Sequence, residues 1–163
     1  SQPFNNHFLT HYKEYTKKGI QLIWQCGKNN SYIKNVVNSK NVIVKPFIDK
    51  IGYAYSTADI VISRAGALAI EELKLFAKPM ILIPFPHAAA NHQYYNASEL
   101  SDAGAAILVE QDDLSNGKLE NEVFNIINNK TMLEKLSINA KNMSFPNAIN
   151  DITTKVMELI NHV

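Results

Sequence analysis

Small and polar residues follow an apolar run near the middle of this chain. Residues 59–63 are mostly β-branched and apolar, and Arg64-Ala65-Gly66 after them predicts a turn that lets a helix begin at about Ala67. The start of a helix carries N–H groups without intrahelical partners and a partial positive charge, so it can bind a phosphate. The guanidinium of Arg64 is either a second phosphate partner or a solvated surface charge. Gly66 alone is a weak signal, because it can simply permit the turn.

The helix that follows this turn carries Glu72, one turn in from its start. A glutamate near a helix start is usually a partner of the helix dipole. A carboxylate that faces a ligand crevice can also accept hydrogen bonds from both hydroxyls of a ribose. The sequence leaves both interpretations of Glu72 open.

A second polar group comes after the next apolar run, in residues 84–93. Asn91, His92 and Gln93 bring several hydrogen-bond donors and acceptors together, which suits sugar hydroxyls, although the loop could also be filler. His87 and His92 have no nearby cysteine or carboxylate, so their spacing is poor for zinc. We therefore expect no metal ion here.

Strand patterns alternate with helix patterns along the whole chain. The predicted strands are residues 20–26, 42–45, 59–63 and 105–110, with one more before Pro84. The predicted helices are residues 3–18, 32–39, one ending near 57, one from about 67, one after the polar loop of residues 84–93, and 119–128, 131–141 and 147–161. This alternation predicts an α/β fold, a Rossmann-like parallel sheet with helices on both faces. Such sheets bind ligands at the carboxyl ends of their strands, where the polar residues above would lie.

Composition excludes several classes of protein. The 163 residues include 16 basic and 15 acidic side chains, so there is no clustered charge for nucleic acid or anionic lipid. The single Cys26 lies in an apolar run, which predicts a buried thiol and a reducing compartment. No apolar run reaches the roughly 20 residues of a membrane span. We expect a cytoplasmic protein of one domain, with membrane contact only at its surface.

The sequence gives little support for other kinds of catalytic or nucleotide-binding site. The chain has no GxSxG elbow, no Walker loop and no complete GxGxxG. Asp112-Asp113 could hold a metal–diphosphate, but a turn or capping role before a helix is simpler. We expect no cofactor.

Three stretches carry a resemblance to a known family. They are ADIVISRAGALAIEEL (58–73), KPMILIPFPHAAANHQYYNASEL (78–100) and GAAILVEQDDL (104–114). In this order they resemble the C-terminal, donor-binding half of the MurG family, GT-B glycosyltransferases that transfer GlcNAc from UDP-GlcNAc to lipid I and so make lipid II for peptidoglycan. The resemblance covers essentially the whole chain, residues 1–163, as a single donor-binding domain.

The resemblance implies which residues read the base and the sugars of UDP-GlcNAc. Phe47 and Ile48 match a loop whose backbone contacts the uracil edge. Glu72 matches a carboxylate that binds the ribose hydroxyls. His92 and Gln93 match a polar pair that reaches the GlcNAc hydroxyls.

The resemblance also implies how the diphosphate is held. Arg64, Gly66, Ala67 and Leu68 match the turn and helix start that surround it, and Ser1 matches a loop that touches a phosphate. Arg64 would then stabilise the departing UDP during an inverting transfer. As a member of this family the chain is expected to need no metal, and UDP-GlcNAc is a substrate.

Two departures from the family pattern stand out. Ala69 replaces the usual Ser or Thr, so one hydroxyl to the phosphate is lost. The glycine-rich opening loop survives only as Ser1-Gln2, and the strand before it and the N-terminal acceptor domain are absent. We expect that domain to supply the general base, to bind lipid I and to contact the cytoplasmic face of the inner membrane, so this chain alone would not turn over.

Two other hypotheses remain. The chain also resembles a stand-alone donor subunit, like the soluble half of the split eukaryotic enzyme that adds the second GlcNAc to a dolichol-linked sugar. A non-catalytic α/β module that binds a nucleotide or a protein partner is the third possibility.

Overall fold

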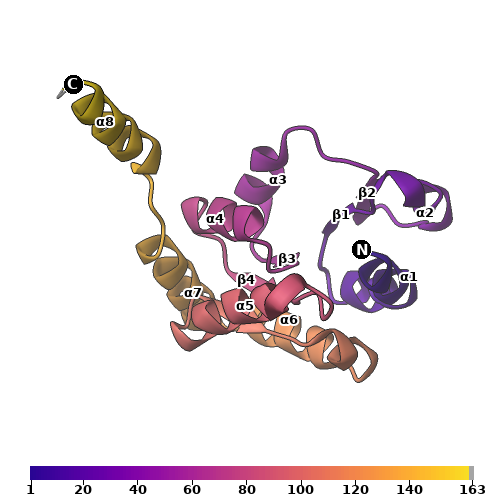
Figure 1. Ribbon diagram of the computed structural model, residues 1–163. Helices are drawn as coiled ribbons and strands as arrows, with labels where there is room; N and C mark the ends of the chain where they lie inside the picture. Colours follow the sequence, from indigo (N-terminus) through magenta and orange to yellow (C-terminus); the bar gives the residue numbers. More distant parts are fainter. Residues whose placement is uncertain (162–163) are drawn as a thin grey trace.

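The computed structural model describes the backbone of residues 1–161 and the side chains of residues 1–148 and 150–160 (Figure 1). The strands are β1 (Leu22–Gln25), β2 (Val42–Lys45), β3 (Val61–Ser63), β4 (Met80–Leu82) and β5 (Ala106–Leu108). The helices are α1 (Gln2–Lys17), α2 (Ile33–Val36), α3 (Ile51–Thr57), α4 (Ala67–Leu75), α5 (His92–Asp102), α6 (Lys118–Asn128), α7 (Lys130–Asn142) and α8 (Ala148–Asn161), with short 3-10 turns η1 (Lys28–Asn30), η2 (Ala89–Asn91) and η3 (Gln111–Ser115). The predicted alternation of strands and helices is confirmed.

All strand pairs are parallel, as predicted, but the hydrogen bonds divide the strands into two sheets. β1 pairs with β2, with Leu22 opposite Val42, and β4 lies between β3 and β5. No ladder joins β1 to β3 among the described residues. Each of these two strands therefore has one edge without a strand partner.

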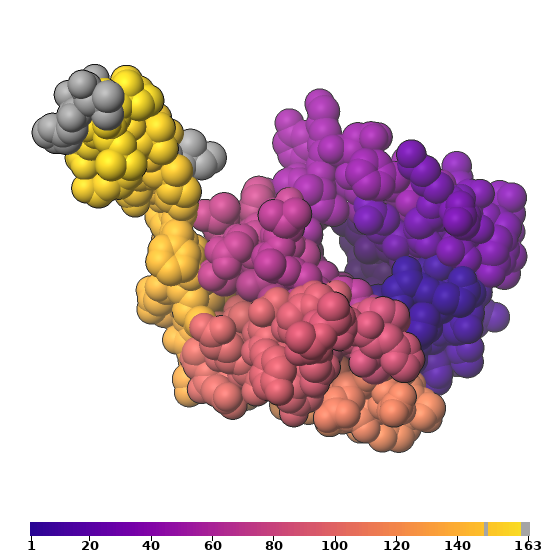
Figure 2. Space-filling view, in the orientation of Figure 1, coloured from indigo at the N-terminus to yellow at the C-terminus, as the bar shows by residue number. Residues whose placement is uncertain are grey.

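An opening separates the two sheets on one face of the molecule. Figure 2 shows it between the N-terminal segments, in indigo, and the segment of α3 and α4, in purple and pink. Below the surface the two parts share one hydrophobic cluster, in which Tyr15, Ile81 and Ile83 are buried and Leu22 and Ile62 pack at the margin. Side chains rather than backbone hydrogen bonds therefore connect the two sheets.

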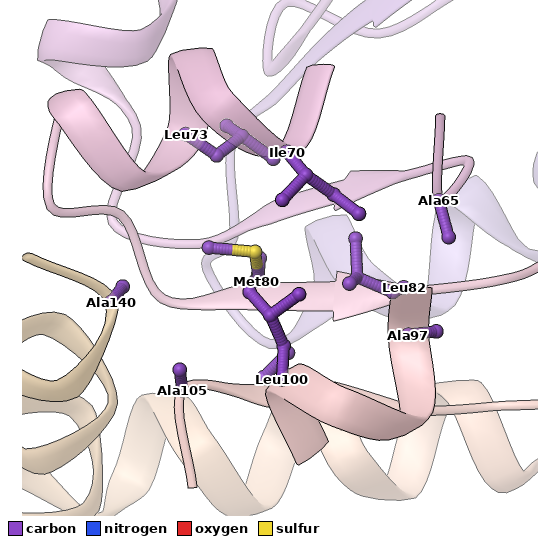
Figure 3. Close-up of a cluster of buried hydrophobic side chains, with 10 residues drawn as sticks. Ala65, Ile70, Leu73, Met80, Leu82, Ala97, Leu100, Ala105 and Ala140 are labelled. Carbon is purple, nitrogen blue, oxygen red and sulfur yellow. The ribbon is translucent and has the colours of Figure 1, made fainter. Parts of the chain in front are cut away.

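The second core lies around β4, which helices cover. Met80, Ile81 and Leu82 are each 0% exposed, as expected for a parallel strand that is buried on both faces. Figure 3 shows Met80 and Leu82 between Ile70 and Leu73 of α4 and Leu100 of α5. This packing fixes the position of α4 relative to the end of β4.

The aromatic stripe of the first helix is part of the core, as predicted. Tyr12 and Tyr15 are buried, and Phe8 packs against Trp24 with ring centroids 5.7 Å apart. Cys26 is a buried free thiol, which confirms its predicted structural role. Helix α1 is thereby attached to β1, and its first residue lies near the ends of the strands.

Helix α8 projects from the rest of the molecule (Figure 1). Its exposed apolar side chains are Ile152, Val156, Met157, Leu159 and Ile160. Among the described residues, no helix combines the length and the apolar character that crossing a bilayer requires.

Candidate functional site

The start of α4 is an uncapped helix N-terminus at the carboxyl end of β3. Gly66 is the N-cap and offers no side chain, and the first hydrogen bond of the helix runs from the Ile70 N–H to the Gly66 carbonyl, at 3.1 Å. The N–H groups of Ala67, Leu68 and Ala69 precede that bond, so they have no partner within the helix. Leu68 is 84% exposed. The predicted turn and helix start are thus present, and the exposed Ala67 and Leu68 lie at the surface; phosphate binding there stays a prediction.

The backbone at Gly66 does not have a conformation that only glycine can adopt. Its φ of −74° and ψ of 141° are open to any residue. A Cβ built at this position meets no atom within 4 Å. The turn therefore does not require glycine at this position, and the missing side chain leaves room above the helix start.

Arg64 ties together chain segments that are far apart in the sequence. One terminal nitrogen donates to the carbonyls of Ile83 (3.2 Å) and Pro84 (2.8 Å). The other donates to the Ser1 hydroxyl (2.8 Å) and to the Gln111 side-chain oxygen (2.6 Å). Both terminal nitrogens thus donate to protein acceptors, and these hydrogen bonds link the end of β3 to β4, α1 and η3. The alternative of a solvated surface charge is therefore wrong, and a contact between Arg64 and a phosphate stays a prediction.

Two aromatic rings complete the surroundings of the guanidinium. Its central carbon lies 4.5 Å from the ring centre of Phe4 and 5.5 Å from that of Phe85. Burial lowers the pKa of Arg64 from its ordinary value, yet an arginine keeps its charge at neutral pH. Arg64 therefore places a fixed positive charge close to the start of α4 without offering its terminal N–H groups.

Glu72 is held by a residue that the sequence did not single out. The Tyr55 hydroxyl, on α3, donates to the Glu72 Oε2 at 3.1 Å. Burial, followed by the nearby Glu72 charge, raises the pKa of Tyr55 to about 12, so the phenol remains a donor at neutral pH. One carboxylate oxygen is fixed in this way, and the exposed carboxylate keeps acceptor capacity for hydroxyls of a ligand.

The loop after β4 is shaped by its own polar side chains. The Gln93 side-chain oxygen accepts from the Phe85 N–H at 3.0 Å, which leaves its NH₂ group as a donor. The His92 Nδ1 lies 2.7 Å from the Ala89 carbonyl, and because a carbonyl only accepts, Nδ1 carries the hydrogen. The neutral ring then presents Nε2 as an acceptor. His92 and Gln93 together offer an acceptor and a donor, as a sugar hydroxyl requires.

Backbone strain marks the same loop. Ala90 has φ 47° and Asn91 has φ 54°, in the left-handed region that residues other than glycine seldom occupy. Two such residues in succession cost free energy that the surrounding structure must offset. The two strained residues directly precede His92, which is the first residue of α5.

The loop after β2 is positioned from β1. The Gln25 side-chain oxygen accepts from the Ile48 N–H at 2.9 Å, and Phe47 beside it is 55% exposed. A base that binds here would meet the ring of Phe47 and the Ile48 carbonyl, since the Ile48 N–H is already used. The role of Gln25 in fixing this loop becomes visible only in the fold.

Asp112 and Asp113 lie in η3, in a turn, as the simpler interpretation predicted. The Asp113 carboxylate accepts from Lys118 Nζ at 2.6 Å and from the Asn116 side chain at 3.0 Å. The Lys118 hydrogen bond holds the pKa of Asp113 below its usual range. Its oxygens therefore serve the turn before α6.

Taken together, the fold and its strand-end residues define a parallel α/β domain of the nucleotide-binding type, with an open helix start at the edge where ligands bind. Comparison with known proteins gives the family. Residues 1–152 match the glycosyltransferase family 28 C-terminal domain. The chain belongs to this family.

Relatives with an established name have a common description. A protein of Christiangramia forsetii is 35% identical over 150 residues, which are 92% of this chain and 41% of the relative; a protein of Vesicomyosocius okutanii is 43% identical over 132 residues, which are 80% and 38%. Both are called UDP-N-acetylglucosamine–N-acetylmuramyl-(pentapeptide) pyrophosphoryl-undecaprenol N-acetylglucosamine transferase. The chain therefore spans about two fifths of the length of these relatives.

A solved structure is similar over the same region. The crystal structure of MurG from Acinetobacter baumannii superposes with a TM-score of 0.70 at 30% sequence identity, covering 86% of this chain and 42% of that protein. The predicted fold, one Rossmann-like half of a GT-B glycosyltransferase, is confirmed.

Proposed function

We propose that this chain is the donor-binding part of an inverting N-acetylglucosaminyltransferase that transfers GlcNAc from UDP-GlcNAc to lipid I. The observation that carries the proposal is the start of α4. Its first N–H groups have no partner within the helix and no capping side chain among the described residues, Gly66 leaves open space above them, and Tyr55 holds Glu72 on the same helix. A diphosphate needs the first two features, and the adjoining ribose needs the third.

The other loops supply the remaining contacts in this proposal. Phe47 and the Ile48 carbonyl meet the uracil, and His92 and Gln93 meet the GlcNAc hydroxyls. Ser1, already a partner of Arg64, lies at the phosphate end of the site. These loops come from both sheets, so the donor would lie across the division between them.

The chemical step follows from the same contacts. The 4-hydroxyl of the lipid-linked MurNAc attacks the anomeric carbon, a new C–O bond forms with inversion, and the bond to the UDP oxygen breaks. The helix start and the charge of Arg64 stabilise the negative charge that develops on UDP, an effect worth several kcal/mol in preorganised sites. The acceptor proton passes to a base that we place in an acceptor half outside this chain, at the cytoplasmic face of the membrane.

Calorimetric titration of the purified chain with UDP-GlcNAc, UDP-GalNAc and UDP tests the proposal. UDP and UDP-GlcNAc are expected to bind, with UDP-GalNAc weaker because its 4-hydroxyl points the other way. Glu72→Ala is expected to lose about 1–3 kcal/mol of binding free energy, because the ribose hydroxyls would lose their acceptor.

Glu134→Ala is the matched control, since Glu134 is an exposed glutamate on α7 whose side chain is 60% accessible. It should bind donor as the unchanged chain does. If a folded sample binds none of the three ligands, the chain is instead a non-catalytic module.

A further inference from the structure

A second group of functional side chains lies between α1 and α6. His7 and His11 are one helical turn apart on α1, and Glu120 lies in the first turn of α6. One ligand atom from each of the three residues lies within 4.8 Å of the others. The side chains of His7 and Glu120 are only 3% and 6% exposed, and that of His11 is 31% exposed. None of these residues belongs to the donor site.

The hydrogen bond of His7 with the backbone determines which of its ring nitrogens faces Glu120. Its Nδ1 lies 3.1 Å from the Leu114 carbonyl. Because a carbonyl only accepts, Nδ1 carries the hydrogen, and in the neutral ring Nε2 then has a lone pair. This nitrogen lies 2.7 Å from the Glu120 Oε1 but makes no hydrogen bond of acceptable geometry with any described residue.

The carboxylate of Glu120 is also incompletely satisfied. The Tyr15 hydroxyl donates to Oε1 at 3.3 Å, whereas Oε2 is buried and has no hydrogen-bond partner among the described residues. A buried carboxylate without full partners is costly. A lone-pair nitrogen and a carboxylate this close together require a cation or a proton between them.

His11 connects this buried pair with solvent. Its ring stacks on that of His7, with centroids 4.7 Å apart and planes at 21°. Its Nδ1 lies 3.3 Å from the Oε1 of the exposed Glu14 and 3.7 Å from the Glu120 Oε1, so an ion would replace the contact with Glu14. His7 and His11 both line an open groove of about 590 Å³ that runs between α1 and η3 and also includes Asp112. An ion can reach the cluster through this groove, and water from it can complete the ligand set.

We propose that His7, His11 and Glu120 bind a divalent transition-metal ion, with zinc as the best match. Two imidazoles and one carboxylate are ligands that zinc prefers, and histidines at i and i+4 present both rings on one face of a helix. The hydrogen bond from His7 Nδ1 to the Leu114 carbonyl is the outer contact that orients a metal-binding histidine. The ion would join α1 to α6 and so hold the end of α1 that carries Ser1.

Metal binding by the chain, purified without an affinity tag and stripped with a chelator, tests this proposal. Zn²⁺ is added in a calorimetric titration, and Co²⁺ is added in parallel with its visible absorption recorded. One equivalent of either ion is expected to bind, Co²⁺ with the absorption of a site of low coordination number, and Zn²⁺ is expected to raise the melting temperature.

His11→Ala and Glu120→Gln are the test variants. The first removes a partly exposed ring, and the second keeps the shape of its side chain and an acceptor for Tyr15, so both should fold. Each is expected to weaken Zn²⁺ binding at least roughly tenfold, as a loss of metal contacts does. His87→Ala removes an exposed histidine elsewhere and should bind as the unchanged chain does.

Two results would overturn the proposal. One is the absence of stoichiometric Zn²⁺ and Co²⁺ binding to a folded sample, which would leave the cluster as a pair that shares a proton. The other is binding that neither test variant weakens, which would place the ion elsewhere on the chain.

Discussion

The carboxylate of Glu72 owes its position to another helix. Tyr55 on α3 donates to one of its oxygens at 3.1 Å, and Tyr55 in turn packs on Phe76 with ring centroids 5.6 Å apart. A flexible glutamate is thereby ordered before any ligand arrives. Ordering in advance lowers the entropy cost of binding, so Tyr55 should influence donor affinity without touching the donor.

The test of this positioning role is Tyr55→Phe, which removes only the hydroxyl. We expect donor affinity to fall about fivefold, which corresponds to the roughly 1 kcal/mol of one hydrogen bond. Titration with UDP-GlcNAc measures the change. Tyr53→Phe on the same helix is the control, because Tyr53 is 71% exposed and should have no effect. Equal donor affinities of the two variants would show that the Tyr55 hydroxyl does not position Glu72 for donor binding.

At the scale of the elements, Arg64 is the only arginine among 16 basic residues. A lysine could supply the same charge to a diphosphate, but its single nitrogen cannot span acceptors on opposite sides. The guanidinium here donates in two directions, to the end of β4 and to α1 and η3. The main structural role of Arg64 is therefore to hold the ends of β4, α1 and η3 together.

Arg64→Lys keeps the positive charge at this position and removes the planar guanidinium with its several donors. We expect the free energy of unfolding to fall by about 2 kcal/mol, because partly buried carbonyls lose their donor. Urea unfolding followed by circular dichroism measures it. Lys130→Arg, at a side chain that is 90% exposed, should leave stability unchanged. If the Arg64→Lys variant is as stable as the unchanged chain but binds the donor less tightly, Arg64 contacts the ligand instead of stabilising the fold.

Most elements could be predicted from the sequence because their signals are local. The β-branched run before Arg64 and the turn at Gly66 predicted the helix start at Ala67, where α4 begins. The contacts between residues were harder to predict, because they depend on how segments far apart in the sequence pack together. Tyr55 meets Glu72 from another helix, and His7 meets Glu120 across more than 100 residues of chain. No spacing in the sequence encodes those distances.

At the scale of the whole molecule, the hydrogen-bond ladders fall into two sheets. β4 is paired on both sides and fully buried. Within the described part of the chain β1 and β2 pair only with each other, and they expose Ile23 and Ile43 at 44% and 54%. Regions with few buried contacts open at lower free energy than the core. The β1–β2 part should therefore be the less stable one.

Hydrogen exchange followed by mass spectrometry tests this difference. Amides of Leu22–Gln25 and Val42–Lys45 are expected to exchange well before those of Met80–Leu82. Saturating UDP-GlcNAc should slow the exchange of the first group, because in the proposed function the donor contacts the Ile48 loop and α4 together. Uniform exchange across all strands would show that the molecule opens as one unit.

The separation of the two sheets would also determine the width of the proposed donor site. The Ile48 loop belongs to the β1–β2 part and the start of α4 to the β3–β4–β5 part, so the distance between them is set by side-chain packing across the division. Leu22 and Ile62 belong to this packing and lie outside the proposed ligand contacts. A change of volume at either residue would alter the spacing between the base-reading loop and the phosphate-reading helix start. In the proposed function, selectivity for the length of the nucleotide would therefore depend on the hydrophobic core.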